Sequence, residues 1–233
     1  MDRSIALWRR AAAEGLAAFA LVFAGCGAIV ADREYDGALG TVGIGLVFGL
    51  VIAAMVYATG HLSGAHINPA VTLAFALTRH FPRREAGAYI GAQLIGALAA
   101  ALVLLGVWPE QPADLGATSP TVGAGSALVY ELLLTAILMF VIMAVATDTR
   151  AVGPAAAIAI GSAVGLDALF GGPVTGASMN PARSFGPALA AGEWGDFWVY
   201  VAGPIGGAAL GALAYQLLRG ERGDGAGPVR LPA

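Results

Sequence analysis

Two stretches of the chain, Ser63-Gly-Ala-His-Ile-Asn-Pro-Ala-Val-Thr72 and Thr175-Gly-Ala-Ser-Met-Asn-Pro-Ala-Arg-Ser184, share one pattern and decide the fold. In each, an asparagine is followed by a proline and then by an apolar run. This order predicts a helix with Asn68 or Asn180 as its N-cap and the proline at its first position. The run after Asn68 lasts about ten residues, or roughly 15 Å, which is about half of a 30 Å hydrocarbon core. We therefore expect each stretch to begin a half-helix.

The composition is that of a membrane protein. Charged residues make up 12% of the 233 residues, about half their usual share, and the mean hydropathy is +0.77. The only cysteine, Cys26, cannot form an intrachain disulfide. A net charge of -3 offers no basic surface for nucleic acid. Six apolar runs are long enough to span a bilayer, at about 11–31, 41–59, 86–108, 127–147, 153–170 and 197–218.

The order of these runs predicts an inverted repeat. We expect a single channel domain over 1–233, built from repeats at 8–108 and 127–218 and followed by a disordered tail at 219–233. Each repeat has three full spans, an odd number, so the second copy is inserted with the opposite polarity. The two half-helices then enter from opposite faces and meet near the middle of the membrane. Irregular backbone at that depth must pack in protein or line a water-filled cavity.

The arginines predict the orientation, since all twelve basic residues are arginine. With both termini in the cytoplasm, only Arg33 lies in an outer loop and Arg183 lies at membrane depth. This excess fits the positive-inside rule and predicts a multi-pass protein of the plasma (inner) membrane. The remaining ten arginines are cytoplasmic: Arg3, Arg9, Arg10, Arg79, Arg83, Arg84, Arg150, Arg219, Arg222 and Arg230.

The paired Asn-Pro-Ala motif, inside GHLSGAHINPAVT and TGASMNPARSFGPA, resembles the major intrinsic proteins, the family of aquaporins and glycerol channels. The resemblance runs from about Glu14 to Tyr215 and is closest to a bacterial-type aquaporin. It implies an all-α membrane fold of six transmembrane helices plus two half-helices. It also implies a passive channel for water and small neutral solutes, embedded in membrane lipid as a homotetramer with one pore per subunit.

The residues around the two asparagines are the predicted pore lining. The side-chain amides of Asn68 and Asn180 offer donors to a passing solute, and the two helix starts place positive dipole ends at the centre, which disfavours cations and protons. The extended residues before each asparagine can turn carbonyl acceptors into the lumen, with a glycine at the turn. The predicted motif residues are Asn68, Pro69, Ala70, Asn180, Pro181 and Ala182, and the predicted backbone lining is Gly64, Ala65, His66, Ile67, Gly176, Ser178 and Met179.

The family resemblance marks a selectivity filter of Phe48, Ala168, Ala177 and Arg183. Water-selective members usually carry histidine at the position of Ala168, so we expect a wider, less polar ring. A register shift of one residue would instead place Asp167 in the filter.

Four other positions bear on the solute. Ser184 and Ala188 argue against a dedicated glycerol channel, whereas Tyr200 and Val201 resemble plant intrinsic proteins. The expected solutes are therefore water and small uncharged molecules such as glycerol, ammonia and metalloid acids.

An alternative role for Arg183 is a structural ion pair with Glu131 or Asp167.

Glu14 and Glu131 are carboxylates at membrane depth. The resemblance implies that they are structural and accept hydrogen bonds from the loops before the half-helices. An alternative is a proton-coupled secondary transporter of a small solute that uses these two acids as a relay, and a third possibility is a membrane scaffold without transport. The sequence contains no enzyme fingerprint, no cofactor motif and no His or Cys pattern typical of a metal site.

Overall fold

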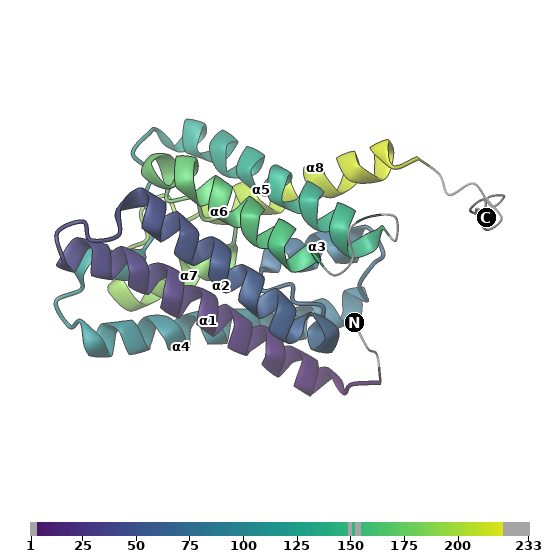
Figure 1. The fold of residues 1–233 in the computed structure, drawn as a ribbon, viewed down its shortest axis with the longest axis horizontal. Helices are drawn as coiled ribbons and strands as arrows, with labels where there is room; N and C mark the ends of the chain where they lie inside the picture. Colours follow the sequence, from purple (N-terminus) through teal and green to yellow (C-terminus); the bar gives the residue numbers. More distant parts are fainter. Residues whose placement is uncertain (1–3, 149–150, 152–154, 221–233) are drawn as a thin grey trace, which may run out of the picture.

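The computed structural model describes residues 4–148, 151 and 155–220, and these residues form only helices, turns and loops. Six long helices are apolar enough to cross a membrane. Two short helices, α3 and α7, follow the two asparagines (Figure 1). The long helices are α1 Leu7–Glu34, α2 Gly40–Ser63, α4 Ala86–Val107, α5 Ala124–Thr147, α6 Ala156–Thr175 and α8 Val199–Leu218, and the short ones are α3 Pro69–Leu77 and α7 Pro181–Ala191. The predicted all-α fold with six spans and two half-helices is confirmed.

The helix ends differ from the sequence expectation in one instructive place. The run Gly171-Gly172-Pro173 suggests a helix end near 170, but α6 continues through Pro173 to Thr175. It stops where Gly176 adopts a left-handed conformation with φ 85°, and α2 stops in the same way at Gly64 with φ 94°. The expected start of this span at 153 and the tail beyond 220 lie outside the described residues.

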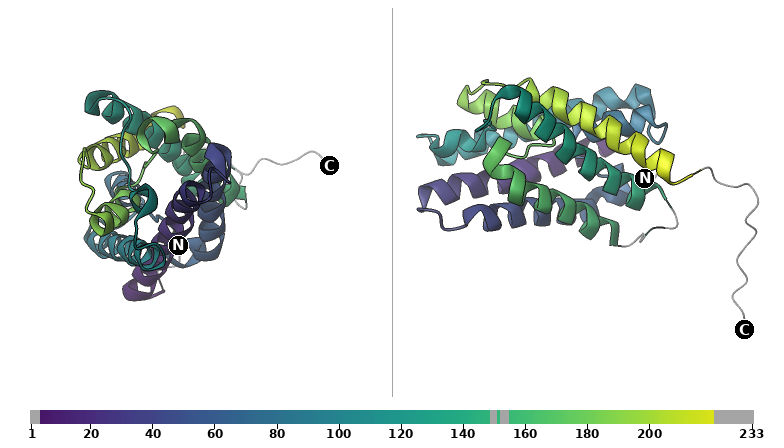
Figure 2. Two further views of the ribbon diagram at one scale, coloured as in Figure 1. Left: turned by 90° about the vertical axis from the view of Figure 1, so that its left-hand side faces the viewer. Right: turned by 90° about the horizontal axis from the view of Figure 1, so that it is seen from above.

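The packing of the helices follows the repeat. In the first half α1 packs on α2 and α4, and in the second half α5 packs on α6 and α8. The halves join through α2 against α6, and each half-helix packs on the other half, α3 on α8 and α7 on α4. Figure 2 shows the long helices grouped around the axis of the bundle. This exchange of half-helices fixes the inverted repeat and brings their first residues together at the centre.

Glycines allow the closest helix crossings. A Cβ added at Gly96 on α4 would overlap the carbonyl oxygen of Gly15 on α1. At the junction of the halves, a Cβ at Gly49 on α2 would lie 2.7 Å from the carbonyl oxygen of Gly161 on α6. Small residues at such crossings are the usual means of association between helices in lipid, where burial of apolar surface gives no driving force.

Replacing Gly96 by valine is expected to separate α1 from α4 and to destabilise the protein by about 1–3 kcal/mol, because the backbone must move to admit the side chain. Gly91→Val is the matched control: it changes the same helix, and a Cβ at Gly91 meets no atom within 4 Å. Thermal unfolding in detergent measures the difference. Equal midpoints for the two variants would show that the crossing tolerates a side chain.

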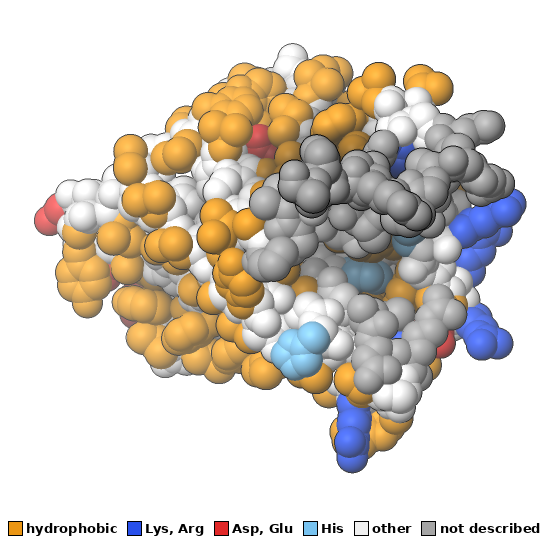
Figure 3. All heavy atoms as spheres, turned by 45° about the vertical axis from the view of Figure 1, so that its right-hand side comes forward, with side chains coloured by type: hydrophobic (Ala, Val, Ile, Leu, Met, Phe, Trp, Pro, Cys, Tyr) orange, Lys and Arg blue, Asp and Glu red, His pale blue; other side chains and the backbone are white. Residues whose placement is uncertain are grey.

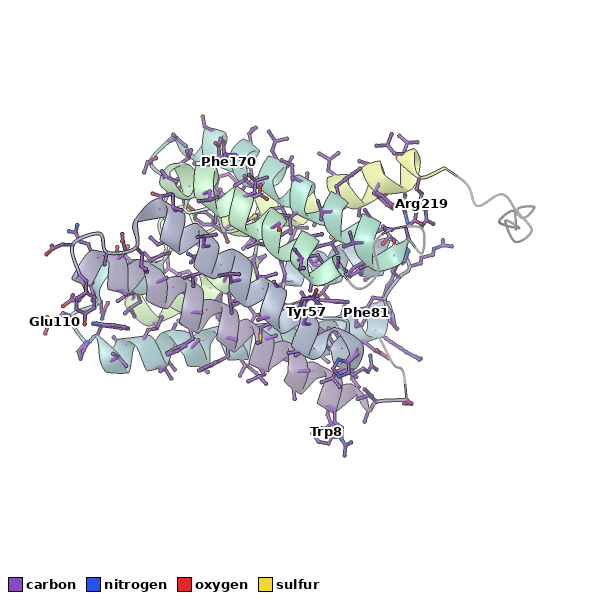
Figure 4. All side chains as sticks on the ribbon, viewed as in Figure 1. Trp8, Tyr57, Phe81, Glu110, Phe170 and Arg219 are labelled. Carbon is purple, nitrogen blue, oxygen red and sulfur yellow. The ribbon has the colours of Figure 1, made fainter. Side chains whose placement is uncertain are left out.

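Arginine side chains gather at one end of the bundle. This is the end where Trp8 near the start of α1, Phe81 after α3 and Arg219 after α8 lie, and Glu110 lies at the other end (Figure 4). With the first of these ends turned forward, Figure 3 shows arginine side chains along it and hydrophobic side chains over much of the remaining surface. Arg3, Arg150, Arg222 and Arg230 lie outside the described residues.

Candidate pore and selectivity filter

The two half-helices meet at their N-termini through the side chains of Asn68 and Asn180. Each asparagine caps its own helix: the Asn68 Oδ1 accepts the amide of Ala70 at 2.8 Å, and the Asn180 Oδ1 accepts the amide of Ala182 at 3.0 Å. Each also donates one side-chain N–H across the junction. The Nδ2 of Asn68 bonds the carbonyl of Met179 at 2.7 Å, and the Nδ2 of Asn180 bonds the carbonyl of Ile67 at 3.0 Å.

These reciprocal bonds refine the sequence expectation. The side-chain nitrogen of asparagine has two N–H groups. One of them holds the opposite loop, and the other is left for a cavity that lies between the two halves of the protein. Both asparagines line that cavity.

The loops before the asparagines hold an unusual backbone. Ala65 and Ile67 have φ values of 49° and 58°, and Ala177 and Met179 have values of 42° and 53°. Positive φ is costly for residues with a Cβ, most of all for a β-branched one such as Ile67. Such strain persists only where surrounding contacts hold the backbone in place. Here two buried carboxylates hold the loops through hydrogen bonds.

Glu14 holds the first loop and is fully buried. Its Oε1 accepts the Ser63 hydroxyl at 2.6 Å and the His66 amide at 2.9 Å, and its Oε2 accepts the Ile67 amide at 2.6 Å. The side chain of Gln93 on α4 donates a fourth bond at 2.8 Å. Four donors satisfy a carboxylate that has no access to water.

Glu131 holds the second loop in the same way but with three donors. Its Oε1 accepts the Thr175 hydroxyl at 2.7 Å and the Ser178 amide at 2.9 Å, and its Oε2 accepts the Met179 amide at 2.8 Å. Pro204 stands where Gln93 stands in the first repeat, and a proline ring offers no donor.

The loops line a narrow cavity between the two halves. Gly64, Ala65, His66 and Ile67 from the first loop and Ala177, Ser178 and Met179 from the second all contribute to its wall. Another part of the wall is apolar and includes Leu138 and Ile142 of α5. The volume is about 60 Å³, enough for about four to six water molecules at roughly 10–15 Å³ each.

The predicted filter residues lie where this cavity adjoins a larger one of about 350 Å³. Phe48, Ala168 and Arg183 line both, and Ala177 lines the narrow one. The Arg183 guanidinium lies 5.2 Å from the centre of the Phe48 ring. Asp167 lines neither cavity, so α6 turns Ala168, and not Asp167, toward them.

Arg183 is held by backbone and not by an acid. It is 2% exposed, and its NH1 donates to the carbonyl of Gly116 at 2.7 Å. Its Nε and NH2 have no hydrogen-bond partner in the described part of the chain. The salt bridge found among the described residues joins Arg10 to Glu85. The alternative ion pair of Arg183 with Glu131 or Asp167 is not formed.

The supporting roles of three groups were not predicted from the sequence. Tyr89 donates to the carbonyl of Ser63 at 2.8 Å, and Tyr200 donates to that of Thr175 at 2.7 Å, so each fixes the end of a helix before a pore loop. These tyrosines are 111 positions apart, the interval that separates Gln93 from Pro204, and that spacing was the available signal.

Gly116, the third group, lies in the turn Pro112–Gly116 of the long connection. A Cβ at Gly116 would come within 2.8 Å of that of Cys26. The loop can therefore approach α1 only with glycine at this position.

Comparison with known proteins places this geometry in a family. The model of the major intrinsic protein family matches residues 1–215. The chain belongs to the major intrinsic protein family. This major intrinsic protein is 50% identical over 226 residues to aquaporin NIP1-4 of rice, Oryza sativa subsp. japonica, covering 96% of this chain and 82% of the relative. It is 45% identical over 216 residues to nodulin-26 of Glycine max, covering 93% of this chain and 80% of the relative.

A solved structure shows the same fold. The aquaglyceroporin of Plasmodium falciparum matches this major intrinsic protein with a TM-score of 0.80 at 27% sequence identity, covering 90% of this chain and 96% of the other. The family and the fold that the paired Asn-Pro-Ala motif indicates are thus confirmed.

Proposed function

We propose that this major intrinsic protein, a passive channel, conducts water in single file together with small uncharged solutes. The observation that carries the proposal is the pair of asparagines at the meeting tips of α3 and α7. Each keeps one amide N–H for the narrow cavity that both line. A solute that sheds part of its hydration finds donors at this point and polar loop backbone around it. No step in this path requires an energy source.

The exclusion of cations follows from positive charge at the asparagine pair and in the filter. The N-terminus of each half-helix carries roughly half a positive elementary charge, and the buried Arg183 adds a full one in the filter. A cation must pass both in surroundings of low dielectric constant, where repulsion is stronger than in water. A neutral molecule meets no such barrier.

The filter sets the size of the solute. Alanine at positions 168 and 177 leaves space opposite Phe48 and Arg183 that a larger side chain would fill. Relatives named aquaporin and a structural neighbour named aquaglyceroporin support water and a polyol as substrates. We propose glycerol, ammonia and metalloid acids as the neutral solutes beside water.

The Ala168→His variant tests this filter directly. We expect the wild-type protein in liposomes to conduct water and glycerol, and the histidine to reduce glycerol permeability at least about tenfold while water still passes. Stopped-flow light scattering under water, glycerol and urea gradients measures both. Ala157→Ser, on the same helix but outside both cavities, is the control. Glycerol flux that is absent from the wild type would refute the wider filter.

Sensitivity to mercurials gives a second check. Cys26 is fully buried against the connection that carries Gly116 and lines neither cavity, so the wild-type channel should be insensitive to mercury. Ala177→Cys places a thiol in the narrow cavity, so mercury should block water flux through this variant. A reducing agent should reverse that block. Strong block of the wild type would point to Cys26 instead.

The remaining assignments are proposals of the same kind. The arginine-rich end of the bundle supports cytoplasmic termini and insertion in the plasma (inner) membrane. The family resemblance supports a homotetramer with one pore in each subunit. The packing of α1 on α2 and α4, and of α5 on α6 and α8, supports the proposed repeats at 8–108 and 127–218. The proton-coupled alternative is not favoured, since each oxygen of Glu14 already accepts two donors from the scaffold.

A further inference from the structure

Asp167 is a buried acid that the pore does not use. Its side chain is fully buried on α6, one residue before Ala168, and lines neither cavity. Neither carboxylate oxygen has a hydrogen-bond partner in the described part of the chain. An ionised carboxylate buried without donors is among the costliest groups a protein can hold. Asp167 must therefore take up a proton or bind a ligand.

The packing of α6 shows which way Asp167 faces. Gly171 lies one turn further along the same face, because residues four apart in a helix stack above one another. A Cβ at Gly171 would lie 2.8 Å from Cδ1 of Leu134 on α5 and 3.2 Å from Cβ of Ala177 in the second pore loop. The face of Asp167 is thus turned toward α5 and that loop, and Glu131 on α5 is the charged group that acts on it.

Glu131 lacks the donor that Asp167 could supply. Glu14 accepts four hydrogen bonds, the fourth from the side chain of Gln93, whereas Glu131 accepts three because Pro204 replaces the glutamine. Glu131 therefore has one acceptor position open, and the unpartnered Asp167 lies in the same half of the molecule.

We propose that Asp167 is a protonated carboxylic acid that binds one internal water between α5 and α6, and that this water donates the missing hydrogen bond to Glu131. The proton resides on Asp167 because three donors stabilise the charged form of Glu131 and none stabilises that of Asp167. Asp167 is then a positioning residue for the loop that carries Met179 and leads to Asn180.

A bound metal cation explains the site less well. A cation in this position needs more than two carboxylates, and among the described residues no group of three His, Cys, Asp or Glu side chains could hold one. Three of the acceptor positions of Glu131 are already occupied by the loop. A proton neutralises Asp167 without further ligands.

Infrared spectroscopy of the full-length protein in lipid tests the protonation. We expect the wild type to show the C=O stretching band of a protonated carboxylic acid at neutral pH, and Asp167→Asn to lose it. Asp36→Asn, which removes an exposed acid from the loop after α1, should keep the band. An identical band in wild type and Asp167→Asn would overturn the proposal. The spectrum needs no transport, so this outcome is independent of the proposed function.

The positioning role is tested by comparing Asp167→Asn with Asp167→Leu. Asparagine keeps a neutral donor of the same size and should preserve the unfolding midpoint and the ratio of glycerol to water permeability. Leucine fills the space without holding the water, so it should lower the midpoint and shift the ratio. Gln93→Leu, which removes the fourth donor of Glu14, should lower the midpoint in the same way. If leucine and asparagine at position 167 behave alike in both measurements, Asp167 does not position the loop.

Discussion

Arg183→Val is expected to make the channel leak cations. The guanidinium is 2% exposed, its NH1 donates to a backbone carbonyl, and it forms no salt bridge within the described part of the chain. A cation that passes about 4 Å away is repelled by about 4 kcal/mol at an effective dielectric constant near 20. Loss of this barrier should raise cation conductance at least about tenfold, since every 1.4 kcal/mol corresponds to a factor of ten. Water flux should persist, because the asparagine pair is untouched.

Ion leak into proteoliposomes, followed with a potential-sensitive or pH-sensitive dye, measures this effect. Arg33→Val removes the same charge from an exposed position near the end of α1 and should leave the leak unchanged. An Arg183→Val protein with the same leak as the wild type would show that the helix dipoles alone exclude cations.

The second large effect is expected at Glu14. In Glu14→Gln an NH2 group replaces one carboxylate oxygen and faces donors where an acceptor is needed, since each oxygen accepts two. The charge that strengthens the four bonds is also lost. We expect a destabilisation of about 3 kcal/mol or more, which corresponds to roughly 6–12 °C in the unfolding midpoint for a chain of this size. The strained backbone at Ala65 and Ile67 should relax with it.

Glu34→Gln on the same helix is the control, because Glu34 is exposed at the end of α1. The experiment also separates the two roles considered for the acid. A structural carboxylate predicts loss of stability together with loss of water flux. A proton relay predicts a protein as stable as the wild type that has lost only uptake driven by a pH gradient.

The sequence was most informative where a residue's role depends on local chemistry. Asn-Pro specifies a helix start, so both half-helices and their caps were predictable at Asn68 and Asn180. Counting back from Asn180 predicted Ala168 as a filter residue, and in the structure Ala168 lines both cavities. A helix turns about 100° per residue, which explains why the adjacent Asp167 lies on a different face.

The sequence was least informative where long-range contacts decide. The carbonyl that holds Arg183 comes from Gly116 in the connection between the repeats, where Ala113 and Leu115 adopt left-handed φ values of 51° and 55°. No propensity predicts such a turn, because residues with a Cβ rarely adopt it alone. α6 likewise continues through Pro173 to Thr175, although a proline is a local signal for a helix break.

The central claim is that two half-helices hold an asparagine pair over a continuous path for water. Its most direct test is the osmotic water permeability of proteoliposomes that contain the wild-type protein, measured by stopped flow at several temperatures. The account predicts flux that is linear in the osmotic gradient, well above that of empty liposomes, with an activation energy close to that of water diffusion in bulk. Permeability no greater than that of the bare lipid, with the higher activation energy of diffusion through a bilayer, would contradict it.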